Sequence, residues 1–85
     1  MDTKILTFRT IIKKDGKYYH GFVPALTGYH TQGNTIEETK NNLKDAIEGY
    51  LISLKKHGEP IPRDEGYEAM QVIDLGKLFK GLSYA

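Results

Sequence analysis

The feature that most constrains this sequence is a helix-start signal followed by a long apolar stripe. Thr35 and Glu38 have the spacing of a capping box: the Thr35 hydroxyl can accept a hydrogen bond from the Glu38 amide, and the Glu38 carboxylate can accept one from the Thr35 amide. Apolar residues then recur about every 3.6 positions, the period of an α-helix. They are Ile36, Leu43, Ile47, Tyr50, Leu51 and Leu54. With Gly58 as the residue that ends it, the pattern predicts one helix of about six turns whose apolar side faces a core.

Three β-rich segments precede this helix. Residues 4–12 and 18–23 are dense in β-branched and aromatic residues, and a shorter run of the same kind spans residues 29–32. Turn residues separate the segments, so the sequence predicts three short strands in an antiparallel meander.

The register of the first hairpin stays open. Asp15 and Gly16 favour a tight turn, because glycine adopts the positive φ angles that such turns require. Ile12 lies opposite Tyr19 if the loop has two residues, and opposite Tyr18 if it has three. One residue of slip exchanges the two faces of the strand.

A fourth strand is expected after the helix. Pro60 and Pro62 prevent further helix and indicate an extended connection, and residues 67–75 have strand composition. The order β-β-β-α-β predicts an α+β fold, a four-stranded mixed sheet with one long helix on one face. We expect one domain over residues 1–75. Residues 76–85 form a tail that could be a short strand, a helical turn or an oligomer contact.

The other face of this sheet has no segment left to cover it. Apolar and aromatic residues occupy both faces of the first hairpin in either register. An uncovered apolar face usually marks an interface. We therefore expect a homo-oligomer, either a dimer or a tetramer.

Composition narrows the class of protein. The chain has 85 residues, enough for one domain, and its 12 basic and 11 acidic residues give a net charge of +1. This near-zero net charge therefore provides no long-range electrostatic attraction to nucleic acid. The sequence has no cysteine, no signal-peptide pattern and no apolar run near the ~20 residues that span a bilayer. We expect a soluble cytoplasmic protein without disulfides and without a membrane partner.

The stretch from residue 18 to residue 54 resembles the N-terminal domain of the HicB family of antitoxins. The family pattern runs from an aromatic strand through Val-Pro-x-Leu-x-Gly to a short strand, then to Gly-Asx-Thr-x-x-Glu and a helix containing Asn-Leu-x-x-Ala-Ile. The matching residues include Val23, Pro24, Leu26, Gly28, Gly33, Asn34, Thr35, Glu38, Asn42, Leu43, Ala46 and Ile47.

The resemblance implies a fold and a partner. The implied fold is a partial ribonuclease-H-like β-β-β-α-β unit, the same order as the strand and helix signals predict. The implied function is that of an antitoxin, which binds and neutralises a HicA-like toxin by steric cover. Such a toxin is a small protein of double-stranded-RNA-binding fold that cleaves mRNA with a histidine. Longer family members bind operator DNA through a later segment. This sequence ends soon after the expected fourth strand, so DNA binding is not expected of it.

Enzymatic chemistry is not expected. Two-metal nucleases of this fold need a carboxylate on the first strand, and residues 4–12 contain no acid. Glu48 and Asp74 remain, and surface charge is the simpler interpretation of both. His20, His30 and His57 lack metal-ligand spacing. We therefore expect no catalytic residue, no metal and no cofactor.

Six residues are candidates for contact with a partner or a second copy of the chain. They are Tyr18, Tyr19, His20, Phe22, Tyr29 and Ile52. Ile52 projects roughly 140° from the centre of the apolar stripe, on the polar side of the helix. In an alternative interpretation, the aromatic residues and the nearby lysines form a sheet on which RNA bases stack. The chain would then be an orphan oligomeric domain that binds RNA or another protein.

Overall fold

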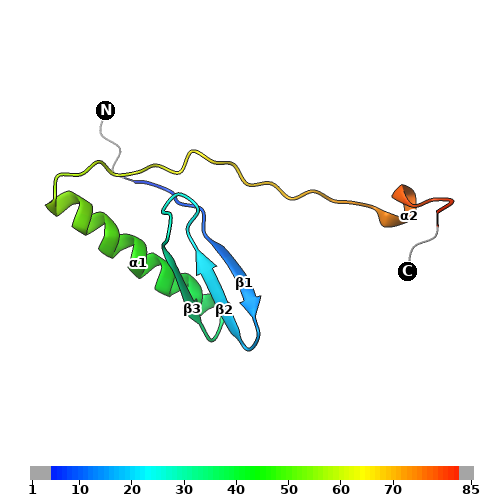
Figure 1. Cartoon of the computed structure of the whole chain (residues 1–85), viewed down its shortest axis with the longest axis horizontal. Helices are drawn as coiled ribbons and strands as arrows, with labels where there is room; N and C mark the ends of the chain where they lie inside the picture. Colours follow the sequence, from blue (N-terminus) through cyan, green and yellow to red (C-terminus); the bar gives the residue numbers. More distant parts are fainter. Residues whose placement is uncertain (1–4, 83–85) are drawn as a thin grey trace.

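The computed structural model describes residues 5–82, and Figure 1 shows its elements. Strands β1 (Ile11–Asp15), β2 (Tyr18–Phe22) and β3 (His30–Gly33) form an antiparallel sheet in the order β1-β2-β3. Helix α1 (Ile36–Lys56) packs on one face of this sheet, and a single turn of helix, α2 (Leu75–Leu78), lies near the C-terminus. The α+β class, the three-stranded meander and the long helix predicted from the sequence are confirmed. The first strand lies later than expected, because it spans Ile11–Asp15 and residues 5–10 belong to no strand.

The β1–β2 hairpin has a register that the sequence did not predict. Asp15 pairs with Tyr18, so the loop consists of Gly16 and Lys17, and Ile12 lies opposite Gly21. Both registers expected from the sequence are wrong, because the lysines before Asp15 belong to the strand and not to the turn. The turn needs a positive φ at its first central residue, which Gly16 supplies with a φ of 63°. That requirement places the turn later than composition indicates.

The capping box at the start of α1 is confirmed, with one difference. The Glu38 amide donates to the Thr35 hydroxyl over 3.0 Å. The Glu38 carboxylate accepts from the amide of Asn34 over 3.2 Å, not from that of Thr35. Both bonds satisfy amide donors at the helix start, so the motif stabilises the helix in the same way.

The core lies between α1 and the sheet. Val23, Leu26 and Leu43 are its centre, and Phe8, Ile12, Tyr29, Ile47 and Tyr50 pack around them. Ile36, which the stripe placed inside, is exposed, and Thr39 is fully buried in its stead. The Thr39 hydroxyl donates to the carbonyl of Thr35 over 2.8 Å, which removes the cost of burying it.

Two glycines let the helix approach the sheet closely. A Cβ on Gly21 would lie 2.7 Å from Cδ1 of Leu43, and one on Gly33 would lie 2.6 Å from Oγ1 of Thr39. Real Cβ atoms do not approach other atoms so closely. The small residues on β2 and β3 therefore set the distance at which Leu43 and Thr39 pack.

The expected fourth strand is the main correction. In the described residues the sheet has three strands, and residues 67–74 pair with none of them. They belong to an extended arm, residues 65–82, that leaves the body of the protein, residues 5–64 (Figure 1). The radius of gyration is 18.2 Å, whereas a compact chain of this length has about 12 Å. β-Propensity in this stretch does not make a strand by itself, because a strand requires a neighbour to pair with.

Candidate partner-binding site

One face of the sheet is free of α1, and we call it the open face. Along each strand, side chains alternate between the two faces. Gly21 and Ile12 face the helix, so their neighbours point the other way. The register then places eight residues on the open face: Ile11, Lys13, Asp15, Tyr18, His20, Phe22, His30 and Gln32.

Aromatic rings, imidazoles and lysines alternate across this face. The rings of His20 and His30 lie 5.2 Å apart and are tilted by 31°. The Lys13 ammonium lies 6.0 Å from the centre of the Phe22 ring. At the hairpin end, Lys17 stands in the same way 5.7 Å from the Tyr18 ring. The open face therefore combines flat apolar surface from its aromatic rings with a small positive charge from its lysines.

The loop after β2 closes one end of the open face. Its backbone folds on itself: the amide of Val23 donates to the carbonyl of Tyr29, and the amides of Leu26 and Tyr29 donate to the carbonyls of Val23 and Leu26. Gly28 has a φ of 87°, a value that side-chain-bearing residues rarely adopt.

A shallow pocket of about 350 Å³ lies against this loop. His20, Phe22 and His30 line it from the strands, and Pro24 and Gly28 line it from the loop. The Val-Pro-x-Leu-x-Gly motif thus shapes a pocket at the margin of the open face. A pocket of this size can take one apolar or aromatic side chain of a partner.

The later motif residues position the sheet against the helix. The Asn42 side-chain amide donates to the carbonyl of Gln32 over 3.0 Å, which joins α1 to the outer edge of β3. Leu43 is 1% exposed and fills the centre of the core, and Ala46 is half-buried one turn further on. These residues hold β3 in place, and β3 carries part of the open face.

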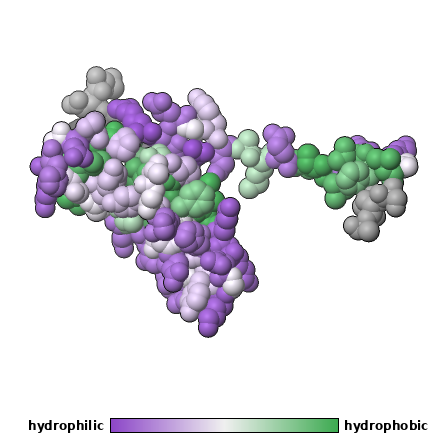
Figure 2. Space-filling view, in the orientation of Figure 1, coloured by the Kyte–Doolittle hydropathy of each residue, from purple (hydrophilic) through white to green (hydrophobic). Residues whose placement is uncertain are grey.

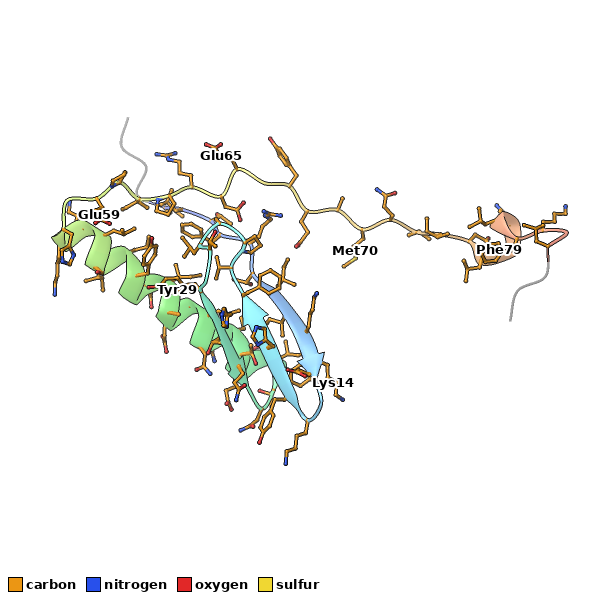
Figure 3. All side chains as sticks on the ribbon, in the orientation of Figure 1. Lys14, Tyr29, Glu59, Glu65, Met70 and Phe79 are labelled. Atoms are coloured by element: carbon orange, nitrogen blue, oxygen red, sulfur yellow. The ribbon has the colours of Figure 1, made fainter. Side chains whose placement is uncertain are left out.

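The six candidate contact residues fall into three groups. Tyr18, His20 and Phe22 share the open face. Tyr19 and Tyr29 lie on the helix side of the sheet. Figure 3 labels Tyr29, whose ring lies 4.6 Å from that of Tyr50 on α1. Ile52 is exposed on α1, away from the core.

The open face is completed by five residues that the sequence did not place among the candidate contacts: Ile11, Lys13, Asp15, His30 and Gln32. Only the strand register puts them beside Tyr18, His20 and Phe22. The alternation of residues within each strand was the available signal, and it could not be used without the correct register.

The carboxylates considered for catalysis are not brought together. Glu48 lies on α1 and Asp74 lies in the arm, where its Oδ1 accepts a hydrogen bond from the Lys77 amide over 3.0 Å. Across residues 5–82, no three His, Cys, Asp or Glu side chains form a group suited to a metal ion. Neither described helix combines the length and apolar character that a membrane crossing requires.

Comparison with known proteins identifies the family. The family model described as UPF0150-like matches residues 9–62. A UPF0150 protein of Thermoplasma acidophilum is 50% identical over 64 residues, which are 74% of this chain and 93% of that protein. One from Synechocystis is 39% identical over 73% of this chain and 80% of its own length.

A solved structure agrees with these sequence matches. The crystal structure of the N-terminal domain of the Burkholderia pseudomallei antitoxin HicB superposes with a TM-score of 0.61. The two chains are 27% identical, and the match covers 86% of this chain and 79% of that one. The chain therefore belongs to the UPF0150-like family and is a HicB-like member of the antitoxin family.

Proposed function

We propose that this chain binds a HicA-like toxin and neutralises it by covering the toxin's RNA-binding surface with the open face. The observation that carries the proposal is the likeness to the HicB N-terminal domain over 86% of the chain. The proposed mechanism is steric and requires no catalytic group. Because the toxin class acts on mRNA, the proposed place of action is the cytoplasm.

The chemistry of the open face supports apolar recognition over charge pairing. Its charged residues are Lys13 and Asp15 on β1, and Lys17 stands beside it in the turn, so it does not present the acidic surface that would attract a basic toxin. Tyr18 and Phe22 offer aromatic area, and partner contacts of this kind contribute most of the affinity in many interfaces. The pocket beside Pro24 can hold a side chain of the toxin as an anchor.

Co-expression with a HicA-like toxin tests the proposal. We expect the native chain to restore growth and to co-purify with the toxin. A variant with Glu48→Ala and Asp74→Ala should do both equally well, because neither carboxylate is part of the open face. If the native chain neither restores growth nor binds the toxin, the proposed function is wrong.

A second pair of variants tests which surface is used. Tyr18→Asp combined with His20→Asp should abolish co-purification, whereas Ile52→Asp on the far side of α1 should leave it intact. Circular dichroism confirms that each variant is folded. The opposite pattern would place the contact on the helix and contradict the role of the open face.

RNA binding is a second candidate, favoured by the lysines that stand over the Phe22 and Tyr18 rings. Sheets that stack RNA bases combine exposed aromatic rings with cations in this way. A salt titration distinguishes the two functions. Affinity for single-stranded RNA should fall steeply as salt increases, whereas an apolar protein interface should be nearly insensitive to salt.

A further inference from the structure

The arm carries apolar side chains that its own chain leaves in solvent. Tyr67, Met70 and Val72 are 97%, 94% and 93% exposed, and Figure 3 shows Met70 clear of every other element. Figure 2 shows hydrophobic residues gathered along the distal arm. Within the described part of the chain, no hydrogen bond joins residues 68–73 to the sheet or to α1. Apolar surface of this extent usually marks an interaction site.

The pattern of the arm is that of a strand covered on both sides. In an extended chain, Tyr67 and Ile73 point to one side, and Met70 and Val72 point to the other. Strands with apolar residues on both sides occur inside sheets whose two faces are both covered. The arm therefore has the composition of a strand whose faces are covered, but it belongs to no sheet.

Strand β1 offers the edge that such a strand needs. It is an end strand of the sheet, and among residues 5–82 only β2 pairs with it. Its outer edge therefore presents backbone N–H and C=O groups that can accept another strand.

A groove lies beside this edge, on the helix side. Because α1 packs mainly over β2 and β3, it leaves a groove of about 530 Å³ between itself and the residues before β1. Its walls include the half-buried apolar side chains of Leu6, Phe8, Ile47 and Leu51. A strand added to β1 would place one of its apolar sides over this groove.

Charge favours the same pairing. Residues 65–74 contain three anions and no cation, whereas the β1 strand and its turn contain three lysines and one aspartate. Two further lysines, Lys40 and Lys44, line the groove together with one carboxylate, Glu48, so the groove also has a net positive charge. The arm anions are Glu65, Glu68 and Asp74, and the lysines of the hairpin are Lys13, Lys14 and Lys17.

The base of the arm is fixed to its own body. The Asp64 carboxylate accepts hydrogen bonds from the Arg9 amide over 2.8 Å and from the Arg9 guanidinium over 3.1 Å. It also accepts one from the Gly66 amide over 2.9 Å, which makes a turn at this point. From there the arm runs away from its own sheet (Figure 1), and the molecule is 61 Å long.

We propose that residues 67–74 of the arm pair with β1 of a second copy of this chain. In the same way, residues 67–74 of the second copy pair with β1 of the first. The fourth strand expected from the sequence is then supplied by the other copy. The exchange closes into a symmetric dimer, because each copy contributes the same arm and the same edge. This inference does not depend on whether the chain binds a toxin.

Light scattering on the full chain tests the exchange. We expect a mass near twice 9.6 kDa. The double substitution Met70→Lys and Val72→Lys should weaken the dimer by roughly tenfold or more, since two ammonium groups would enter an apolar groove that Lys40 and Lys44 already line. Both side chains are almost fully exposed in the single chain, so the variant should fold normally. Asn41→Lys, at an exposed position of α1 outside the groove, is the control and should leave the mass unchanged.

Hydrogen exchange identifies the surface. Amides between residues 67 and 74 should become protected as the protein concentration rises and should lose protection on dilution. Protection in a monomer would mean that the arm folds back onto its own β1, which overturns the proposal. A dimer whose mass survives the double substitution would use another surface and would overturn it equally.

Discussion

The body and the arm of this protein contain similar kinds of apolar residue, but these residues are buried in the body and exposed in the arm. In the body, Leu43 is 1% exposed between α1 and the sheet. In the arm, Met70 is 94% exposed. The difference lies in the neighbours, since the body has a second layer for its apolar face and the arm has none. Whether an apolar side chain is buried therefore depends on a second surface that packs against it. An apolar segment that lacks such a surface indicates an interaction site for a partner.

The two helix starts repeat this contrast. Thr35 caps the 21 residues of α1, and Asp74 caps the four residues of α2 with the same kind of bond to an amide three positions later. In α1 the cap continues into a buried stripe. No residue of α2 is buried, so the Asp74 cap stabilises a helical turn that is not part of the core.

The largest expected difference between body and arm is in the cost of removing an apolar side chain. Leu43→Ala should lower the free energy of unfolding by about 2–5 kcal/mol, because it leaves a cavity in the core. Met70→Ala should lower it by less than about 0.5 kcal/mol at dilutions where the chain is monomeric. Denaturant melts measure both. Equal losses in the dilute protein would mean that the arm is packed on its own body.

Adding a methyl group at the helix–sheet contact should have a smaller effect. Gly33→Ala should destabilise the protein by about 1–3 kcal/mol, because the new Cβ would collide with Thr39. Gly49→Ala on α1 meets no atom within 4 Å and should stabilise the helix by about 0.5–1 kcal/mol. Thermal melts of the two variants should shift in opposite directions. A neutral Gly33→Ala would show that the helix and sheet can move apart freely.

Removing the caps compares the two helix starts directly. Thr35→Ala should lower the free energy of unfolding by about 1 kcal/mol, since an amide at the start of α1 loses its acceptor. Asp74→Ala should not change global stability at dilutions where the chain is monomeric, because α2 buries no residue. Urea midpoints of both variants provide the measurement. A loss of similar size for Asp74→Ala would show that α2 is part of the cooperative unit.

The smallest effect is expected at the joint between body and arm. Hydrogen bonds from the backbone amides of Arg9 and Gly66, and then the Arg9 guanidinium, hold the pKa of Asp64 below its ordinary value of 3.8, although burial opposes them. Because the pKa is lower in the folded state, the joint is stabilised at pH values above the ordinary pKa. This stabilisation is lost as the pH falls through the folded-state pKa.

Amide exchange at Arg9 and Gly66 measures this joint. Protection should decline below about pH 4 in the native chain, and Asp64→Asn should reduce it at neutral pH. Glu65→Gln, at the exposed neighbouring position, is the control and should leave the protection unchanged. A native chain with the same protection at pH 3 as at pH 7 would contradict the role of Asp64.

Part of the candidate site was predictable and part was not. Tyr18, His20 and Phe22 alternate along one short segment, so any register of a strand places them together. Their companions Lys13 and His30 come from other strands. Which residue stands beside which depends on pairing across the sheet, and the two possible hairpin loops considered from the sequence both gave the wrong answer.

The sequence by itself determined what local chemistry controls. The capping box at Thr35, the helix that follows and the turn-forming role of Gly16 rest on interactions between residues close in the chain. The motif that resembles HicB antitoxins was also readable, because its residues are contiguous. Tertiary structure alone decided the burial of Thr39 in place of Ile36 and the absence of a fourth strand over residues 67–74. Each of these depends on distant surfaces that must meet, and a strand-like sequence stays extended in solvent until another edge pairs with it.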